Sequence, residues 1–349
     1  MNYNKRIKNI PQNLWFLINQ IDELKGQWIG GAKMNPQALG RLKRSVLVTS
    51  TGASTRIEGA KLSDEDIEKM MRGLSMQKFA DRDKQEVQGY YELLNNVFNS
   101  AEKIPLSESS IQHLHKELLK YVEKDKLHRG EYKKTENRVE MVNEVGVSVG
   151  VLFDTTPAWL TPKEMLELVE WTKEAMVLKE IHPLLIIANF LVEFLNIHPF
   201  QDGNGRLSRI LTNLMMLQAG YAYMPYVSHE KLIEDNKAEY YLALRKSQKT
   251  LKTESPNIIP WLEFFFNILL TQARQAIEML SKENIEKLLS PKQLLVWKYL
   301  LEVQEATPGE ISKIAKVARP TVSQALDTLM RLKKVERIGQ GRTTRYRRK

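Results

Sequence analysis

Cysteine is absent from the 349 residues of this sequence, so disulfide bonds and thiolate chemistry are both excluded. Long apolar runs are also lacking, since none approaches the roughly 20 residues that a membrane-spanning helix needs. The most apolar stretch, residues 184–195, is too short and contains Asn189 and Glu193. The N-terminal residues lack the apolar centre of a signal peptide. We therefore expect a cytoplasmic protein that makes no membrane contact.

Positive charge is concentrated at one end of the chain. The net charge is +10, and residues 291–349 contain 14 Lys and Arg against 5 Asp and Glu, a net charge of +9. The first 290 residues therefore carry only about +1. An excess of basic residues in one segment is typical of contact with nucleic acid. The length allows two or three domains, and we expect three regions, at residues 1–105, 106–280 and 281–349.

Most of the first 280 residues are predicted to be helical, because apolar residues recur at spacings of three and four. The expected helices cover residues 15–24, 63–70, 86–98, 109–121, 235–247 and 261–280. The glycine-rich segment from Gly26 to Gly31 is expected to end the first of them, and Thr161 before a proline predicts another helix N-cap. Strand periodicity occurs once, at Val145, Val147, Val149 and Val151. The predicted fold is mainly α, with one small β-hairpin between residues 137 and 153.

One stretch of the chain, His198 to Arg209, gathers the groups that bind and transfer phosphate. It reads His-Pro-Phe-Gln-Asp-Gly-Asn-Gly-Arg-Leu-Ser-Arg and lies between two apolar runs, which predicts a polar loop that opens a helix. A helix N-terminus after such a loop binds anions through its unpaired backbone N–H groups. The glycines at positions 203 and 205 let the backbone approach a phosphate closely.

The side chains of this stretch suit separate roles in phosphate transfer from a nucleotide. Asp202 offers the hard oxygen ligands that Mg2+ prefers. Arg206 and Arg209 are three residues apart, share one helix face and could hold the β- and γ-phosphates. His198 could remove a proton from an attacking hydroxyl. The alternative is a capped helix start with surface arginines and a core histidine.

The stretch resembles the motif H-x-F-x-(D/E)-G-N-G-R-x-x-R of the Fic family and matches it at every fixed position. The resemblance extends weakly over residues 10–275. It implies a helical core with a β-hairpin flap, and transfer of AMP from ATP to a Ser, Thr or Tyr hydroxyl of a protein, with release of pyrophosphate. It makes His198 the catalytic base and Asp202 the Mg2+ ligand. The nucleotide-binding residues that it implies are Phe200, Gly203, Asn204, Gly205, Arg206, Arg209, Asn236, Tyr240 and Tyr241.

The same resemblance implies ATP and Mg2+ as cofactors and, as partner, a protein with a target hydroxyl, the chain itself included. Members of the family also move other groups, so AMP is the first expectation among several. The hairpin would pair with the backbone of the target and thereby place its hydroxyl. The resemblance places Asn236, Tyr240 and Tyr241 near the adenine. The alternatives are a purely structural hairpin and, for these three residues, ordinary helix packing.

A second short segment, residues 54–59, resembles the inhibitory motif (S/T)-x-x-x-E-(G/N) of Fic proteins. Ser54 and Glu58 lie one helical turn apart, and Gly59 is a natural helix stop. A carboxylate in the last turn of a helix faces the negative end of the dipole, so a cation is expected nearby. The resemblance implies that Glu58 pairs with Arg209 and prevents productive binding of the γ-phosphate. An alternative role for Glu58 is to position a water that removes AMP.

The basic segment after Ser290 predicts three helices and a hairpin with a glycine-rich tip, an arrangement that resembles a winged helix-turn-helix. The third helix would enter the major groove of DNA, and arginines of the hairpin would contact phosphates. The residues expected on DNA are Thr321, Ser323, Gln324, Arg331, Arg342, Arg345, Arg347 and Arg348. The alternative is a domain used for protein contacts or dimerisation.

Together these features favour an autoinhibited protein adenylyltransferase with a DNA-binding tail. Two other functions stay open, namely a DNA-binding transcriptional regulator whose nucleotide site is a sensor, and a toxin-like protein restrained by Glu58. The intact His198 favours activity over sensing alone. We count a homodimer among the expected assemblies. His113 and His115 are two residues apart on a helix and point in different directions, so metal binding by histidine is not expected.

Overall fold

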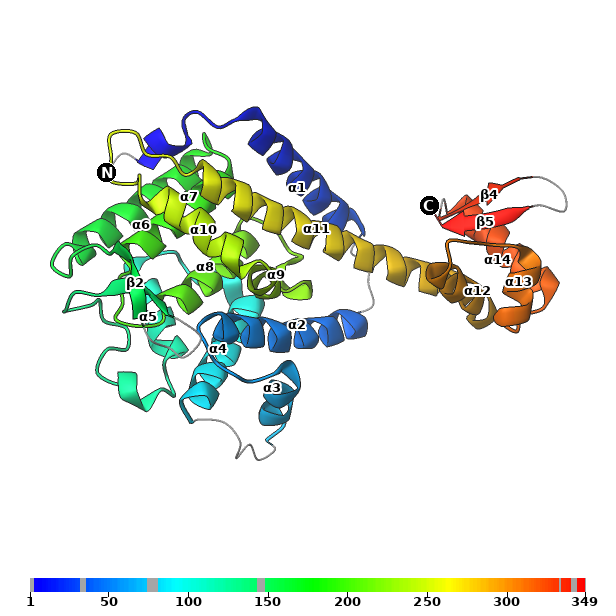
Figure 1. Ribbon diagram of the computed structural model, residues 1–349, viewed down its shortest axis with the longest axis horizontal. Coiled ribbons are helices and arrows are strands. Elements are labelled where there is room, and N and C mark those ends of the chain that lie inside the picture. The colour runs from blue at the N-terminus through cyan, green and yellow to red at the C-terminus, as the bar shows by residue number, and fades with distance from the viewer. Residues whose placement is uncertain are drawn as a thin grey trace. The chain divides into compact units, whose positions relative to one another are not determined.

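The computed structural model divides into two compact units, Met1–Ile277 and Glu278–Lys349 (Figure 1). It describes residues 3–31, 36–73, 81–142, 148–332, 334–339 and 344–348. Most of the described residues are helical, which confirms the predicted mainly α class. None of the helices in these ranges combines the length and apolar character that crossing a bilayer requires. The further boundary predicted near residue 105 stays a prediction.

The N-terminal unit, Met1–Ile277, is built from helices with one β-hairpin. Its helices are η1 (Tyr3–Ile7), α1 (Gln12–Gly31), α2 (Pro36–Ile57), α3 (Asp64–Met71), α4 (Asp81–Ser100), η2 (Ala101–Lys103), α5 (Glu108–Leu118), η3 (Glu123–Asp125), α6 (Thr161–Leu178), α7 (Pro183–Ile197), α8 (Asn204–Gln218), η4 (Met224–Tyr226), α9 (His229–Asp235), α10 (Lys237–Gln248) and α11 (Ile259–Leu288), the last of which continues past the end of the unit. Its strands are β1 (Arg138–Val142) and β2 (Ser148–Asp154).

Helix α7 belongs to the core of the N-terminal unit because it is apolar on every side. All of its residues from 184 to 197 are buried, and it packs against α6 and α8. The two polar residues noted in this run both have partners. Asn189 Nδ2 donates to the backbone oxygen of Tyr3 at 3.1 Å, and Glu193 forms a buried ion pair with Arg6. Burial of the whole helix fixes its C-terminal end, where the central stretch begins.

Helices α2, α4 and α5 all contact α8, the helix that follows the polar loop. The approach of α4 to α5 depends on Gly89. A Cβ atom at this position would lie 2.2 Å from the backbone oxygen of Leu118, so a side chain cannot be accommodated without moving the backbone. The close contact brings side chains of α4 and α5 to the same end of α8.

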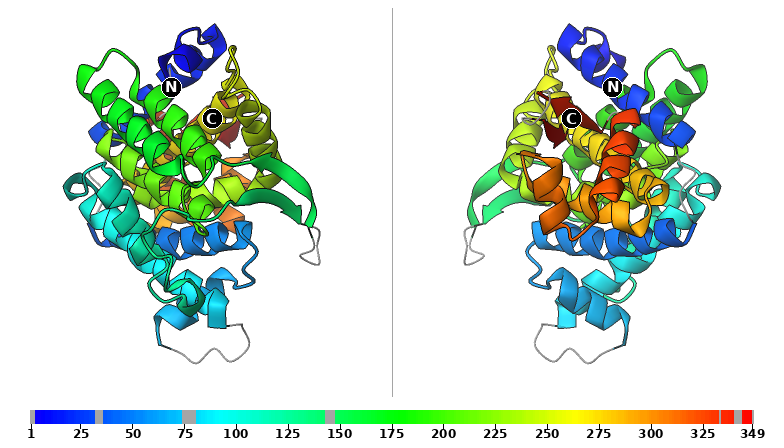
Figure 2. Two further views of the ribbon diagram at one scale, coloured as in Figure 1. Left: turned by 90° about the vertical axis from the view of Figure 1, so that its left-hand side faces the viewer. Right: turned by 90° about the vertical axis from the view of Figure 1, so that its right-hand side faces the viewer.

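Strands β1 and β2 form an antiparallel hairpin that extends from the side of the helical unit, as Figure 2 shows. Val139 pairs with Phe153 and Val142 with Ser148, with two register shifts between these ends. The hairpin lies where the valine alternation predicted one, although Val145 and Val147 themselves are outside the described residues. It is the only sheet in the described part of this unit.

The first helix does not break at Gly26, where the glycine-rich segment begins, so the predicted break there is wrong. Helix α1 continues from Gln12 through Gly26 to Gly31. The reason is the packing of its last turns, where Trp28 is buried and its ring stacks on Tyr226 at a centroid distance of 5.2 Å. Burial of an aromatic side chain outweighs the cost of roughly 1 kcal/mol that each glycine adds to a helix.

Two other helix ends also differ from the predictions. Leu160, not Thr161, occupies the N-cap of α6, and the Thr161 hydroxyl donates to the backbone oxygen of Pro157 at 3.0 Å. The helix expected over residues 235–247 is interrupted at Asn236, which separates α9 from α10. Asn236 Nδ2 donates to the backbone oxygen of Leu232 at 2.8 Å, so this side chain binds the end of α9.

The C-terminal unit, Glu278–Lys349, has its own core and a small sheet. Its elements after α11 are α12 (Pro291–Glu302), β3 (Glu305–Ala306), α13 (Pro308–Ile314), α14 (Arg319–Arg331), β4 (Val335–Ile338) and β5 (Arg345–Arg348). Capping boxes at Ser290 and Thr307 start α12 and α13. The sheet has the antiparallel order β3-β5-β4, of which only β3 was not anticipated from the sequence.

Candidate active site and candidate DNA-binding surface

The polar loop between α7 and α8 begins and ends in left-handed backbone conformations. His198 ends α7 with a φ of 53°, and Gly203 precedes α8 with a φ of 79°. Pro199 cannot continue a helix, so α7 must stop before it. A positive φ is unfavourable for a histidine, and surrounding contacts must hold it in place. The loop is therefore a constrained turn.

His198 is set up as a neutral base at the start of this loop. Its Nδ1 lies 3.3 Å from the backbone oxygen of Leu195, which can only accept a hydrogen bond. Donation from Nδ1 leaves Nε2 with a free lone pair. Burial lowers the pKa of His198 to about 4, so the ring is uncharged near pH 7. A neutral imidazole with a free Nε2 can accept a proton from a hydroxyl.

Asn204 closes the loop through its side-chain amide. Its Oδ1 accepts from the backbone N–H of Phe200 at 2.9 Å, and its Nδ2 donates to the Phe200 oxygen at 2.7 Å. Both residues are buried. The predicted contact between Asn204 and a phosphate stays a prediction, whereas its contact with the loop backbone is a feature of the structure. Phe200 serves as the apolar anchor around which the loop turns.

His115 of α5 packs against the loop, a contact that the sequence did not predict. Its ring stacks on Phe200 with centroids 3.8 Å apart, and its Nδ1 accepts from the backbone N–H of Gly130 at 2.9 Å. Nε2 therefore carries the hydrogen and donates to the backbone oxygen of Asp202 at 3.0 Å. Burial lowers the pKa of His115 to about 4, so this neutral tautomer persists near pH 7. The one sequence feature that could have indicated its burial is that His115 lies beside the apolar residues of α5.

Asp202 is surrounded by positive charge. Its Oδ1 accepts from the backbone N–H of Gly203 at 2.6 Å, and its Oδ2 lies 2.9 Å from Arg82 Nη2 and 3.2 Å from Arg206 Nη2. Burial alone would raise the pKa of Asp202, but Arg206, the Gly203 N–H and Arg82 together outweigh burial, and the pKa is lowered. Glu86 of α4 binds both arginines, at 2.8 Å from Arg82 Nε and 2.9 Å from Arg206 Nη1. Neither Arg82 nor Glu86 was identified from the sequence.

Arg209 is buried and points toward the end of α2. Its Nη2 donates to Glu58 Oε1 at 2.7 Å and to the backbone oxygen of Ser54 at 3.0 Å, and its Nε donates to the Ser54 hydroxyl at 2.8 Å. Burial would lower the pKa of Arg209, but the Glu58 carboxylate, together with Tyr240 and Tyr90, outweighs burial and raises the pKa. The guanidinium is therefore a permanent cation with an internal anion as its partner.

The Glu58 carboxylate also lies against the first turn of α8. A Cβ atom built on Gly205 would come within 2.3 Å of Glu58 Oε1, so the absence of a side chain at Gly205 makes room for this oxygen. Helix N-termini attract anions, because their N–H groups are unpaired and the helix dipole is positive there. Glu58 thus places a negative charge at the helix end where a phosphate would be favourable.

The end of α2 that carries Glu58 is itself held by cations. Gly59 follows it with a φ of 104°, a conformation that suits glycine. Lys237 Nζ donates to the backbone oxygen of Ile57 at 2.8 Å, and Arg56 Nε lies 2.6 Å from Glu234 of α9. These contacts offset the unfavourable position of a carboxylate at a helix C-terminus.

Only part of the predicted adenine site lies near the phosphate site. Tyr240 is buried, its ring meets that of Tyr241 edge-on at 5.2 Å, and burial raises its pKa, with Arg209 opposing the rise. Tyr240 is thus within electrostatic range of Arg209. Asn236 is exposed, and its amide is bound to the end of α9. Roles for these three residues toward adenine stay predictions.

Asp202 is the one carboxylate of the polar loop that could bind a metal ion. Among the residues described here, no three His, Cys, Asp or Glu side chains gather into a metal-binding group. Asp202 Oδ2 nevertheless already binds two cations, the guanidinium groups of Arg82 and Arg206. Mg2+ commonly binds through one or two carboxylates and takes its other ligands from phosphates and water. The donor chemistry of Asp202 therefore fits a Mg2+ ion that arrives with a nucleotide.

The C-terminal unit presents several of the predicted DNA-contacting residues on α14. Ser323, Gln324 and Arg331 are exposed, and Thr321 is half-buried. Arg345 and Arg347 of β5 lie within ion-pair distance of Glu305 and Glu336, at 3.3 and 2.5 Å. Arg348 is exposed, whereas Arg342 lies outside the described residues.

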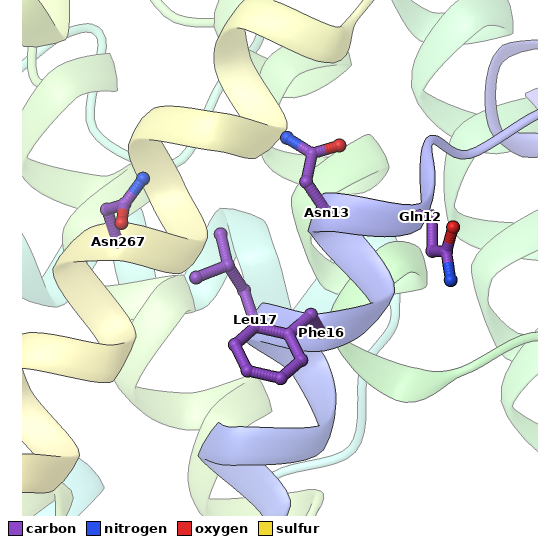
Figure 3. Close-up of a pocket in the computed structure, with 5 residues that line it drawn as sticks. All are labelled: Gln12, Asn13, Phe16, Leu17 and Asn267. Carbon is purple, nitrogen blue, oxygen red and sulfur yellow. The ribbon is translucent and has the colours of Figure 1, made fainter.

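A surface depression of about 570 Å³ lies elsewhere on the N-terminal unit, between α1 and α11 (Figure 3). The residues that line it are Gln12, Asn13, Phe16, Leu17 and Asn267. None of them belongs to the polar loop or to the inhibitory segment. Phe16 is 65% exposed, so the depression is open and partly apolar.

Comparison with known proteins assigns the class of this site. A family model described as "Fic/DOC family" matches residues 105–216, which include the hairpin, the loop and most of α8. A Fido domain-containing protein of Dictyostelium discoideum is 35% identical over 106 residues, which cover 30% of this chain and 69% of that protein. The chain belongs to the Fic/DOC family.

Relatives outside Dictyostelium agree with this assignment. A protein of Aquifex aeolicus named "probable protein adenylyltransferase" is 26% identical over 125 residues, 35% of this chain and 38% of that protein, so the match spans well under half of the relative. A crystal structure of a Fic family protein from Desulfovibrio desulfuricans has a TM-score of 0.64 at 22% identity and covers 98% of this chain and 97% of its own. The latter likeness concerns the fold.

Proposed function

We propose that this protein transfers AMP from ATP to a hydroxyl group of a protein. One observation carries the proposal most directly. The anionic carboxylate of Glu58 occupies the space over Gly205 at the start of α8 and pairs with the buried Arg209. A site that holds a carboxylate between a helix N-terminus and an arginine also suits the outer phosphates of a nucleotide.

The chain supplies a base and a phosphate site for this reaction. His198 Nε2 takes the proton of the target hydroxyl, whose oxygen forms a bond to the α-phosphorus of ATP. The bond between the α-phosphorus and the bridging oxygen breaks, and pyrophosphate leaves. Arg209 and the N–H groups of α8 hold the phosphates and stabilise their charge. Mg2+, when bound at Asp202, would supply further neutralisation of the phosphate charge.

We propose that Glu58 keeps the wild-type protein largely inactive. Its carboxylate uses the arginine that would hold the γ-phosphate, and it places a like charge beside that phosphate. Ser54 binds the same guanidinium, so the pair is held from one helical turn. An ATP molecule bound in spite of Glu58 would be displaced from the geometry that transfer requires.

The β1–β2 hairpin is our candidate for the target-binding element. An exposed strand edge can pair with an extended peptide through backbone hydrogen bonds. Lys133 and Asn137 connect the base of the hairpin to the His198 turn, so a peptide on the hairpin would be placed relative to the base. This supports a protein, and not a small molecule, as the acceptor.

Replacement of Glu58 tests the proposal. Glu58→Gly should raise transfer of radiolabelled AMP from ATP to protein by at least about tenfold, the factor that corresponds to 1.4 kcal/mol. Glu65→Gly, which removes an exposed carboxylate of α3 paired with Lys69, is the matched control and should leave transfer unchanged. Equal transfer by the Glu58→Gly protein and the wild type would count against inhibition by Glu58.

We propose DNA binding by the C-terminal unit as a second function. The net charge of +9 over residues 291–349 supports it, together with the exposed polar face of α14. A helix that follows a short turn after another helix is the arrangement by which winged helix-turn-helix domains read the major groove. Arg331 at the end of α14 and the arginines of β5 would neutralise backbone phosphates.

A further inference from the structure

Four side chains beside the polar loop form a closed ring of alternating charge. Arg82 and Glu86 come from α4, and Asp202 and Arg206 come from the loop and α8. Each carboxylate contacts both arginines, with four nitrogen-to-oxygen distances between 2.8 and 3.2 Å. The two units of positive charge and two of negative charge balance within the ring.

The members of this ring differ in how firmly they are held. The Arg206 side chain is 2% exposed and the Glu86 side chain 9%, whereas Arg82 is 47% and Asp202 36% exposed. Glu86 binds Arg206 independently of Asp202, so Arg206 keeps a buried partner if Asp202 changes its contacts. Arg82 is the member that can leave the ring with the least cost, since its guanidinium can return to water.

The oxygen that Arg82 occupies is the one available to a metal ion. Asp202 Oδ1 accepts a short hydrogen bond from the Gly203 backbone, which belongs to the loop itself. Oδ2 lies 2.9 Å from Arg82 Nη2 and 3.2 Å from Arg206 Nη2. A divalent ion bound to Oδ2 would repel both guanidinium groups, and only the exposed one is free to move away.

We propose that Arg82 is an internal cation that neutralises Asp202 until a divalent metal ion takes its place. This inference rests on the proposed function, because it concerns the same nucleotide site. Without metal, Arg82 shields the incoming triphosphate from the Asp202 charge. With metal, Arg82 is displaced from Oδ2, and the metal ion does the neutralising. Arg82 is thus a positioning residue that sets how strongly metal and nucleotide binding depend on each other.

The size of the effect follows from the exposure of the pair. An exposed ion pair contributes up to about 1 kcal/mol, which is about fivefold in an equilibrium constant. Loss of Arg82 should weaken metal-free nucleotide binding by about two- to fivefold. It should leave binding with saturating metal unchanged or slightly tighter, because the metal no longer displaces an arginine. The improvement in affinity on adding metal should therefore grow by about two- to fivefold.

Calorimetric titration of the full-length chain measures this difference directly. The ligand is α,β-methylene ATP, whose methylene bridge prevents cleavage, and each protein carries Glu58→Gly so that the phosphate site is open. Binding is compared in EDTA and in saturating MgCl2, with and without Arg82→Gln. Arg82→Lys keeps the charge and should resemble the parent, and Arg72→Gln, which removes an exposed arginine of the Arg72–Glu68 pair, is the matched control.

The expected result is weaker binding by Arg82→Gln in EDTA only. An equal change in EDTA and in MgCl2, or no change in either, would overturn the role of Arg82 and leave the proposed function intact. Absence of binding by the Glu58→Gly parent in both conditions would overturn the nucleotide site itself, and the role of Arg82 with it. In an Asp202→Asn background, Arg82→Gln should no longer weaken binding in EDTA more than in MgCl2, because the charge for which Arg82 and the metal compete is absent.

Discussion

Burial keeps His115, His198 and His229 of the N-terminal unit neutral. The first two form or contact the polar loop. His198 begins the loop with a free Nε2, and His115 fixes the Asp202 backbone from α5. The pKa of each is lowered to about 4 because the charged form would lose its hydration. The same residue type therefore keeps Nε2 free in one place and uses both ring nitrogens for structural hydrogen bonds in the other.

Replacement of His115 should destabilise the fold. His115→Ala would leave the Gly130 N–H and the Asp202 oxygen without partners and open a cavity beside Phe200. Each unsatisfied buried group costs about 1–3 kcal/mol, so we expect the free energy of unfolding to fall by about 3 kcal/mol or more. Denaturant titration of the full chain measures it. His113→Ala, two residues away and exposed, should change the value by less than about 0.5 kcal/mol. Similar losses in the two variants would contradict the supporting role of His115.

At the scale of elements, the hairpin and the turn at His198 are joined through one buried lysine. Lys133 Nζ donates to the backbone oxygen of Ile197 at 3.0 Å, to Thr155 Oγ1 at 2.7 Å and to Asn137 Oδ1 at 2.8 Å. Asn137 in turn donates to the backbone oxygen of Phe200 at 2.9 Å. Burial lowers the pKa of Lys133 to about 8, so it is still mostly charged near pH 7 and can make all three bonds. The link explains how His198 is kept at a positive φ.

Loss of this link should impair transfer more than binding of ATP. In the Glu58→Gly background, Lys133→Met should lower kcat by about tenfold or more, because small displacements of a base from its substrate are costly, while the KM for ATP changes little. Lys134→Met is the control, since Lys134 is 79% exposed and contacts only the neighbouring Glu131 in its ion pair. Radiolabel transfer at varied ATP concentration gives both constants. A change confined to the KM for ATP would show that Lys133 does not position the catalytic turn.

The sequence identified the residues of the polar loop but not the residues that support the loop from other helices. His198, Asp202 and Arg209 belong to one continuous stretch whose spacing is set by the turn and the first helical turn of α8. Arg82, Glu86 and His115 contact that stretch from distant positions in the chain, and the packing of α4 and α5 brings them there. Lys133 contacts Ile197, directly before the stretch. Local patterns do not record such distant pairings.

The fold class was predictable from local patterns in the sequence, whereas the ends of the helices were not. Apolar spacing gave helices in the right regions, because each must bury one face. Glycine signals failed in α1, where Trp28 packs on Tyr226, and the proline signal at Thr161 was displaced by one residue. In α1 a tertiary contact overrode a local propensity, whereas at Thr161 the hydroxyl binds the nearby Pro157 oxygen and does not cap the helix.

At the scale of the whole molecule, the excess positive charge and the polar loop belong to different units of the chain. The C-terminal unit carries most of the net charge, and the polar loop lies in the N-terminal unit. We expect the full-length protein to bind duplex DNA with an affinity that falls steeply as salt rises. Arg331→Ala should reduce the slope of log affinity against log salt by about 1, whereas Arg72→Ala in the N-terminal unit should not. Gel shifts at several salt concentrations measure this, and no shift at low salt would rule out DNA binding.

The central claim is that the polar loop transfers AMP from ATP with His198 as the base. It is tested most directly by incubating the Glu58→Gly protein with ATP labelled at either the α- or the γ-phosphate, beside the same protein with His198→Ala. The account predicts protein-bound label from α-labelled ATP only, release of pyrophosphate, and loss of labelling in the His198→Ala variant while nucleotide binding persists. Label from the γ-phosphate, or undiminished labelling without His198, would contradict it.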